Sequence, residues 1–308
     1  KLKNVKMPES NKKQALVPED SIILENHNGT APGFIMEKDS KIIVILPGPP
    51  KEMIPMYCES VEPYLKKFTN EIIFSKTIRT FGIGESAMSE TVEDLLEGSN
   101  PTVAPYAKSG EALLRVTAKA ENETEAEKLM APVVAEIEKR LGKYVYGIDC
   151  NSIEEATARL LTERKQTVAF AESCTGGLCA KRLTDISGAS EIFHCGVVSY
   201  SNDIKHKVLG VKAETLDKYT AVSEQTAKEM AEGIRLLADA SYGVSITGYA
   251  GPGDSDEVGT IYIGVSDGKK TVVKELLTGH RGDNCRDYNR HVAASNAFNQ
   301  LRIMILSE

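Results

Sequence analysis

The feature that most constrains the fold is an apolar stretch that stops abruptly at a polar turn containing two glycines. Residues 167–171 read Thr-Val-Ala-Phe-Ala and are followed at once by Glu172. Ser-Cys-Thr-Gly-Gly comes next, and then an amphipathic segment with basic residues begins. A short apolar run bounded by turn residues indicates a buried strand, and the glycines mark a turn into a helix. This strand–turn–helix unit predicts an α/β domain.

The C-terminal half of the chain continues the same alternation. Ser152 with Glu155, and later Ser223, are typical residues at the start of a helix. The order of elements over residues 148–308 predicts an α/β/α sandwich, a sheet with helices on both faces. Its strands are predicted at 167–171, 196–200, 242–247, 260–265 and 271–277, and its final helix at 287–305.

A smaller module is predicted before the sandwich, over residues 73–147. Short strands at 78–81 and 112–118 alternate with helical segments. The longest of these helices is expected at 123–141, with Asn122 as its capping residue. The segment therefore reads as a compact α+β module between two larger parts of the chain.

Residues 1–72 contain less regular structure. One apolar strand at 42–46 runs directly into Pro-Gly-Pro-Pro, which must end it, and one helix is predicted at 51–67. One strand and one helix are too little for a self-sufficient α/β domain. The length of 308 residues is typical of two or three domains.

Charge and composition exclude several classes of function. The net charge of −7 argues against broad, non-specific binding to nucleic acid. No apolar run is long enough to span a bilayer, and no signal-peptide pattern is visible, so a cytoplasmic protein without a membrane partner is expected. The six scattered cysteines lack the spacing of a zinc site, which favours free thiols in a reducing compartment.

Three loops are expected at the carboxyl ends of the strands, where ligands of such sheets bind. They comprise residues 172–177, residues 200–202 with Lys205 one turn further on, and residues 247–253. In the first loop, two glycines allow close approach to a ligand, and the free N–H groups at the helix start favour an anion. That anion is either a phosphate or the oxyanion of an attacked carbonyl, and the sequence leaves both open.

Ser173 and Cys174 are the candidate nucleophiles of the first loop. A hydroxyl needs a base near neutral pH, and no histidine of this domain is an obvious one. Lys205 can serve if burial removes its proton, although spacing alone also fits an ordinary solvent-facing helix lysine. The residue after an inward-pointing serine is expected to point away and pack, which favours Ser173 over Cys174.

Several sequence blocks resemble a known family. AESCTGG, VVSYSNDIKHKVLGV, AVSEQTAKEMAEG and SITGYAGPG with EVGTIYIG occur in the order of the C-terminal domain of the CinA family, which also exists alone as nicotinamide mononucleotide deamidase. FGIGESAMSE lies in a segment that resembles a KH-type linking module. NKKQALVPED, ENHNGTAPGF and LPGPPKEM resemble the later part of the CinA N-terminal domain, a relative of molybdopterin-binding proteins.

The resemblance implies three domains, at residues 1–72, 73–147 and 148–308. The first would be only the later part of a metal-dependent ADP-ribose pyrophosphatase domain, because the Gly-rich opening motif of that domain has no counterpart here. A divalent metal would belong to that incomplete site alone. The chain beginning at Lys1 is therefore expected to be a piece of a longer protein without that activity, in which an incomplete site is formed by Asn28, Gly29, Thr30, Pro47, Gly48 and Pro49.

For the C-terminal domain, the resemblance implies hydrolysis of nicotinamide mononucleotide to nicotinate mononucleotide and ammonia, a step of pyridine-nucleotide salvage. Ser173 is implied as the nucleophile and Lys205 as the base, with backbone N–H groups near residues 174–176 holding the oxyanion and no cofactor. The implied substrate-binding set consists of Glu172, Cys174, Thr175, Gly176, Gly177, Tyr200, Asn202, Thr247, Gly248, Ala250, Gly251, Arg286 and Arg290.

Some members of this set have expected roles. Thr247 and Gly248 offer a hydroxyl and a close backbone approach to the substrate phosphate, and Arg286 and Arg290 offer planar donor forks. Tyr200, preferred over Tyr249 because it lies in a matched block, would stack on the pyridinium ring.

Two features depart from the family pattern. The loop at 251–259 lacks the extra glycines that many relatives carry, and Thr220 stands where glycine is common. The shortened loop keeps an alternative function open, a catalytically weak interaction protein associated with competence or DNA damage. Relatives are often dimers, so a homodimer is expected.

Overall fold

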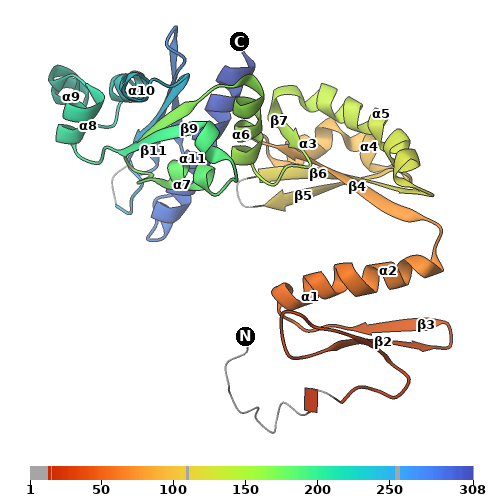
Figure 1. The fold of residues 1–308 in the computed structure, drawn as a ribbon. Coiled ribbons are helices and arrows are strands. Elements are labelled where there is room, and N and C mark those ends of the chain that lie inside the picture. Colours follow the sequence, from red (N-terminus) through yellow and green to blue (C-terminus); the bar gives the residue numbers. More distant parts are fainter. Residues whose placement is uncertain (1–12, 15, 109–110, 254–256, 308) are drawn as a thin grey trace. The chain divides into compact units, whose positions relative to one another are not determined.

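The computed structural model describes residues 13–307 except 15, 109, 110 and 254–256 (Figure 1). The chain divides into two compact units. The first consists of Lys1–Phe74 with Lys119–Ala126, and the second of Ser75–Ala118 with Glu127–Glu308. Residues 254–256, which belong to the shortened loop at 251–259, are among the residues that the structure does not describe.

The first unit contains a three-stranded antiparallel sheet. Its strands are β1 (Ile22–Leu24), β2 (Gly33–Lys38) and β3 (Lys41–Ile45), in the order β1-β2-β3. Only β3 corresponds to the strand that the sequence predicts. The other two were missed because β1 has three residues and β2 ends in Glu-Lys, so neither shows a sustained apolar pattern.

The predicted helix at 51–67 is interrupted in the structure. It consists of α1 (Pro50–Met56), a π-helical turn at Tyr57–Val61, and α2 (Glu62–Leu65), followed by a 3-10 turn. Prolines inside this stretch, Pro55 and Pro63, lack the N–H that a regular helix needs. Met56 and Val61 nevertheless pack against the sheet with Leu24 and Ile35, which closes a small apolar core.

The second unit begins with a four-stranded sheet of order β5-β6-β4-β7. Its longest helix, α5, begins where the sequence predicts, and the side chain of Asn122 accepts a hydrogen bond from the N–H of Glu125 at 3.0 Å. The elements are β4 (Ile72–Thr80), α3 (Glu85–Thr91), α4 (Glu93–Leu96), β5 (Thr102–Lys108), β6 (Glu111–Ala120), α5 (Glu123–Leu141) and β7 (Val145–Ile148).

The rest of the second unit contains a five-stranded sheet of order β12-β11-β10-β8-β9. β8 runs parallel to its neighbours β9 and β10. β11 runs antiparallel to both β10 and β12. The predicted strands are all present, with β9 starting three residues earlier than expected. They are β8 (Val168–Glu172), β9 (Phe193–Val198), β10 (Tyr242–Gly248), β11 (Thr260–Ser266) and β12 (Thr271–Leu277).

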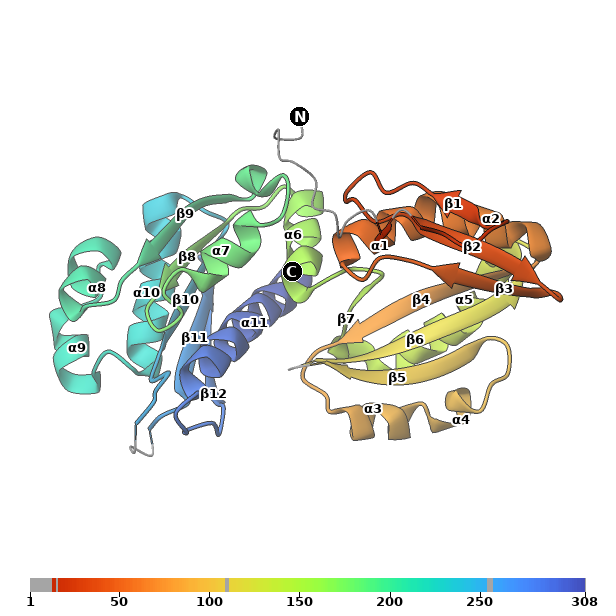
Figure 2. The ribbon, with the colours of Figure 1, turned by 90° about the horizontal axis from the view of Figure 1, so that it is seen from below.

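Helices cover both faces of this sheet, which confirms the predicted α/β/α sandwich (Figure 2). Val168 and Phe170 of β8 pack into one apolar cluster, and Ala169 and Ala171 pack into another, because successive strand residues point to opposite faces. The first cluster contains residues of α6 (Ile153–Arg164), α7 (Leu178–Thr184) and α11 (Cys285–Leu306), and the second contains residues of α8 (Asn202–Leu209), α9 (Ala213–Tyr219) and α10 (Glu224–Ala238).

Thr220, which follows α9, adopts a backbone conformation suited to glycine. Its φ is 66° and its ψ is 176°, and its side chain is exposed. Non-glycine residues in this region carry about 1–3 kcal/mol of strain. The sequence departure at Thr220 therefore corresponds to real strain in the turn before α10.

We predict that Thr220→Gly raises the free energy of unfolding by about 1 kcal/mol, because relief of strain exceeds the entropic cost of the glycine. Urea unfolding of the two proteins measures this difference. Thr220→Ala, which has a Cβ but no hydroxyl, is the matched control and is expected to show no such gain. Equal stability of Thr220→Gly and Thr220→Ala would contradict a strained turn.

Candidate active site

Ser173 and Lys205 meet at the carboxyl edge of the sheet. Ser173 lies directly after β8, and its N–H donates to the carbonyl of Ile246 on β10 at 2.9 Å. Lys205 lies on α8, which begins beyond β9 and whose N-terminus is capped by Ser201. The Nζ atom of Lys205 lies 3.1 Å from the Oγ atom of Ser173. The two residues, 32 positions apart in the chain, therefore form a hydrogen-bonded pair.

The environment of Lys205 favours the uncharged amine. Lys205 is only 1% exposed, and this burial lowers the pKa of its side chain from the ordinary value. Within the described residues, Lys205 forms no ion pair with a carboxylate. Nζ donates to the carbonyl oxygen of Ser199 at 2.8 Å. A neutral amine held in this way keeps a lone pair that can accept the proton of Ser173.

The backbone after Ser173 supplies a small number of unused donors. The N–H of Gly176 donates to the carbonyl of Ser173 at 3.1 Å, so this donor is already used within the turn. Among the described residues, the N–H groups of Cys174 and Thr175 have no acceptor. The hydroxyl of Thr175 is also buried without a partner. These groups are the remaining candidates for stabilising negative charge near Ser173.

Glu172 stabilises the start of α7. Glu172 is 1% exposed. Its carboxylate accepts hydrogen bonds from the N–H groups of Gly177, Cys179 and Ala180 at 2.9, 3.1 and 2.9 Å. These are the donors that an anion at this helix end would require. Glu172 therefore has a structural role at this N-terminus, and its predicted contact with the substrate stays a prediction.

Cys174 points into the core, as the sequence predicts. It is 6% exposed and belongs to the larger apolar cluster of the sandwich. Burial raises the pKa of its thiol to about 12. A thiol with this pKa carries almost no thiolate near neutral pH, so Cys174 is a poor nucleophile.

The first turns of α11 connect the three predicted loops. Arg290 donates through Nη2 to the carbonyl of Thr175 at 2.7 Å. Arg286 donates to the carbonyl of Gly251 at 2.8 Å and to the hydroxyl of Tyr200 at 3.2 Å. The structure thus brings together one predicted residue from each loop with both predicted arginines. Tyr200 is 63% exposed, so the face of its ring remains accessible.

Other predicted residues of the third loop have structural partners. The hydroxyl of Thr247 donates to the carbonyl of Ala221 at 2.6 Å. A Cβ added at Gly248 would lie 2.7 Å from the carbonyl of Thr260, so this glycine allows the close packing of β10 on β11. These contacts give both residues a structural role, and their predicted role in binding phosphate stays a prediction.

Asn289 and Ser199 were missed by the sequence analysis. Asn289 is fully buried and donates to the carbonyl of Ala250 at 3.0 Å, which fixes the third loop. Ser199 orients Lys205 through its carbonyl, a contact that its side chain does not encode. The spacing of Asn289 between the two arginines is the only sequence signal that marks it. Asn202, by contrast, is exposed at the first position of α8.

Three further properties bear on the chemistry. None of the six cysteines forms a disulfide. Within the described ranges, His, Cys, Asp and Glu side chains do not gather in threes as a metal site would require. Over the same residues, every helix is too short or too polar to cross a membrane.

Lys205→Met provides a test of the lowered pKa. Between the folded pKa and the ordinary value of 10.5, the unfolded wild-type chain binds a proton that the folded chain does not. The stability of the wild type therefore falls as the pH decreases through this window, by up to about 1.4 kcal/mol per pH unit. The methionine side chain binds no proton, so the stability of the Lys205→Met protein relative to the wild type is expected to rise as the pH falls. Urea unfolding at several pH values measures this, and a constant difference would contradict it.

Glu172→Gln provides a test of the α7 cap. An amide has one acceptor oxygen in place of two and no charge, so at least one N–H of α7 loses its partner. We expect a loss of about 2–3 kcal/mol in the free energy of unfolding. Glu191→Gln, which changes an exposed glutamate on the same domain, is the control. Equal small effects of both substitutions in chemical denaturation would show that the cap contributes little.

Two family models and a solved structure match parts of this chain. Residues 150–305 match the family described as the CinA C-terminal domain, and residues 75–147 match the family described as the KH domain of damage-inducible protein CinA. A solved structure of a competence/damage inducible protein from Agrobacterium tumefaciens is 36% identical, covers 51% of this chain and 97% of that chain, and has a TM-score of 0.47.

Two curated relatives match over almost the whole chain. A competence-damage inducible protein of Caldanaerobacter subterraneus is 53% identical over 284 residues, which are 91% of this chain and 69% of the relative. One from Clostridium botulinum is 51% identical over 303 residues, which are 97% of this chain and 73% of the relative. The chain therefore belongs to the CinA family of competence-damage inducible proteins.

Proposed function

We propose that this chain is an amidohydrolase that converts nicotinamide mononucleotide to nicotinate mononucleotide and ammonia. The observation that carries the proposal is the 3.1 Å contact between the Ser173 hydroxyl and the buried amine of Lys205. A hydroxyl is a weak nucleophile unless a base takes its proton, and a lysine whose pKa is lowered by burial can act as that base. The proposed reaction uses no metal or other cofactor.

In the first half of the reaction, Ser173 forms an acyl intermediate. Its Oγ atom attacks the carbonyl carbon of the carboxamide while Lys205 accepts the hydroxyl proton. The carbonyl oxygen becomes negatively charged, and the unused N–H groups of Cys174 and Thr175 are the proposed donors to it. The ammonium of Lys205 then returns the proton to the leaving nitrogen, the C–N bond breaks, and ammonia departs.

In the second half, water restores the enzyme. Lys205, neutral again, accepts a proton from a water molecule that attacks the acyl carbon. The bond to Ser173 breaks, its Oγ atom regains the proton from Lys205, and nicotinate mononucleotide is released. The carbonyl of Ser199 holds the Nζ atom in place throughout, because it accepts one hydrogen bond in either protonation state of the amine.

Substrate recognition is assigned to groups that keep unused donors or exposed faces. A guanidinium has five N–H donors, and the contacts of Arg286 with Gly251 and Tyr200 use two of them. The remaining donors of Arg286 and Arg290 are proposed to bind the phosphate. Tyr200 is proposed to stack on the cationic pyridinium ring. Glu172 and Thr247 are left out of these proposed contacts, because the carboxylate of one and the hydroxyl of the other are used within the protein.

The proposal predicts ammonia release from nicotinamide mononucleotide, with much less from free nicotinamide or glutamine. Ser173→Ala is expected to lower kcat/KM by about a thousandfold or more. Lys205→Arg is expected to do the same, because arginine keeps its proton. Cys174→Ala is the matched control and is expected to retain activity. In the wild type, the rate is expected to rise with pH through the lowered pKa of Lys205.

Two outcomes would contradict this mechanism. Activity that persists in Ser173→Ala would move the nucleophile to Cys174 or to water. Absence of turnover with all three amides, together with a stable complex with another protein, would instead support an interaction protein with an inactive site.

A further inference from the structure

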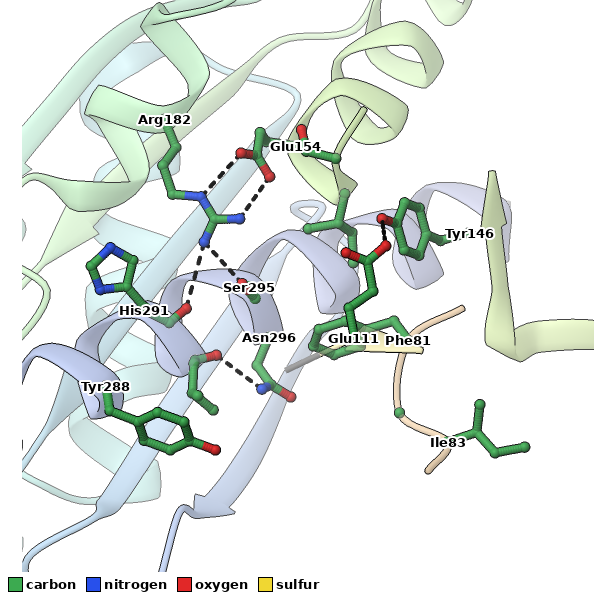
Figure 3. A pocket seen from close by; sticks show the side chains of 14 residues that line it. Phe81, Ile83, Glu111, Tyr146, Glu154, Arg182, Tyr288, His291, Ser295 and Asn296 are labelled. Atoms are coloured by element: carbon green, nitrogen blue, oxygen red, sulfur yellow. Dashed lines mark hydrogen bonds and ion pairs between the residues drawn. The ribbon is translucent and has the colours of Figure 1, made fainter. Parts of the chain in front are cut away.

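A cavity lies away from Ser173 and Lys205, neither of which lines it. It has a volume of about 570 Å³ and is lined by residues of the KH domain and of the C-terminal domain, which belong to the same compact unit. The turn after β4, with Phe81, Gly82 and Ile83, forms one wall together with Glu111 and Tyr146 (Figure 3). Tyr288, Val292 and Asn296 of α11 face this wall. Cavities of this size typically hold a small organic molecule.

The charges that line the cavity are already balanced. Arg182 donates to both carboxylate oxygens of Glu154, at 2.6 and 3.2 Å, and the two side chains are each 16% exposed. Glu111 is paired with Arg79 at 2.8 Å. His291, at the edge, is paired with Asp287. Among the described residues, the lining therefore offers no unpaired cation to an anionic ligand.

Aromatic and apolar groups make up much of the cavity wall. Phe81, Tyr146 and Tyr288 contribute rings, and Ile83, Ile153 and Val292 contribute aliphatic surface. Figure 3 shows the Phe81 segment and the Tyr288 ring on opposite sides of the opening. Such walls bind flat, aromatic ligands through stacking and apolar contact.

The unused hydrogen-bonding groups of Glu111 and Ser295 indicate which groups a ligand would present to this wall. Glu111 accepts hydrogen bonds from Arg79 and Tyr146 through its Oε1 atom, whereas among the described residues its Oε2 atom has no donor. Because Glu111 lines the cavity, this oxygen can accept a hydrogen bond from a ligand that carries N–H groups. Ser295 accepts a hydrogen bond from Arg182 at 2.9 Å and keeps its own hydroxyl proton to donate.

We propose that this cavity is a binding site for a neutral purine nucleoside whose ring edge presents N–H donors to Glu111. Guanosine has adjacent donors at N1 and at its exocyclic amine, and both can face the carboxylate. In adenosine, N1 carries a lone pair that would face the negative charge. A nucleotide adds a charged phosphate for which the described lining provides no unpaired cation. The preference is therefore guanosine over adenosine and over guanosine 5′-monophosphate.

Isothermal titration calorimetry of the full chain with these three compounds tests the proposal. Guanosine is expected to bind at one site, and the other two at least about tenfold more weakly. Val292→Phe fills the cavity from α11 and is expected to abolish binding. Glu111→Gln removes the negative charge without changing the shape of the side chain. It is expected to weaken the binding of guanosine by about tenfold. Because it is isosteric, it tests the same point if Val292→Phe lowers stability.

Two control variants separate binding in this cavity from binding elsewhere on the protein. Ile303→Phe adds the same bulk to α11 at an exposed position outside the cavity and is expected to leave binding unchanged. Ser173→Ala is also expected to leave it unchanged, because Ser173 does not line the cavity. The proposal is overturned by absence of saturable binding up to about 1 mM guanosine. It is equally overturned by full affinity in Val292→Phe or by loss of binding in Ser173→Ala.

Discussion

The site depends on one lysine amine that is removed from water. Lys205 is 1% exposed, and its Nζ atom contacts the carbonyl of Ser199 and the hydroxyl of Ser173. A charged ammonium in this place would need a carboxylate partner, which the described residues do not provide. A neutral amine has two N–H protons, and the oxygens of Ser199 and Ser173 both lie within hydrogen-bond distance of its Nζ atom. The burial that makes Lys205 costly to charge also lowers its pKa, which is the basis of its proposed role as a base.

In the loop after β8, some polar groups stabilise the backbone and others face the candidate active site. Glu172 uses its carboxylate on the first N–H groups of α7, and the N–H of Gly176 closes the turn on Ser173. Because these contacts fix the backbone on both sides, the hydroxyl of Ser173 is held next to Lys205, and within the described loop the N–H groups of Cys174 and Thr175 stay unused. An acidic residue beside a nucleophile thus acts here as a structural anchor.

Helix α11 links the parts of the C-terminal domain. Arg286 and Arg290 hold the loops around Ser173, whereas Arg302, near the other end of the helix, donates to the carbonyls of Lys143 and Val145 in the KH domain. Residues between these two ends line the large cavity. A single rigid helix therefore contacts the candidate active site, the cavity and the neighbouring domain.

The sequence by itself determined the sandwich, its strands and its capped helices, because apolar periodicity and capping residues are local signals. Family resemblance in the sequence also implied Ser173 and Lys205 as the reactive pair, although spacing alone also fitted an ordinary exposed lysine at position 205. Their contact and the burial of Lys205 were decided by the tertiary structure. Only the tertiary structure decided which polar groups are already used. Glu172, Thr247 and Gly248 have the residue types of a binding site, but their partners lie on α7, after α9 and on β11. The strands β1 and β2 were equally hidden, because pairing across the sheet, rather than a local pattern, makes them strands.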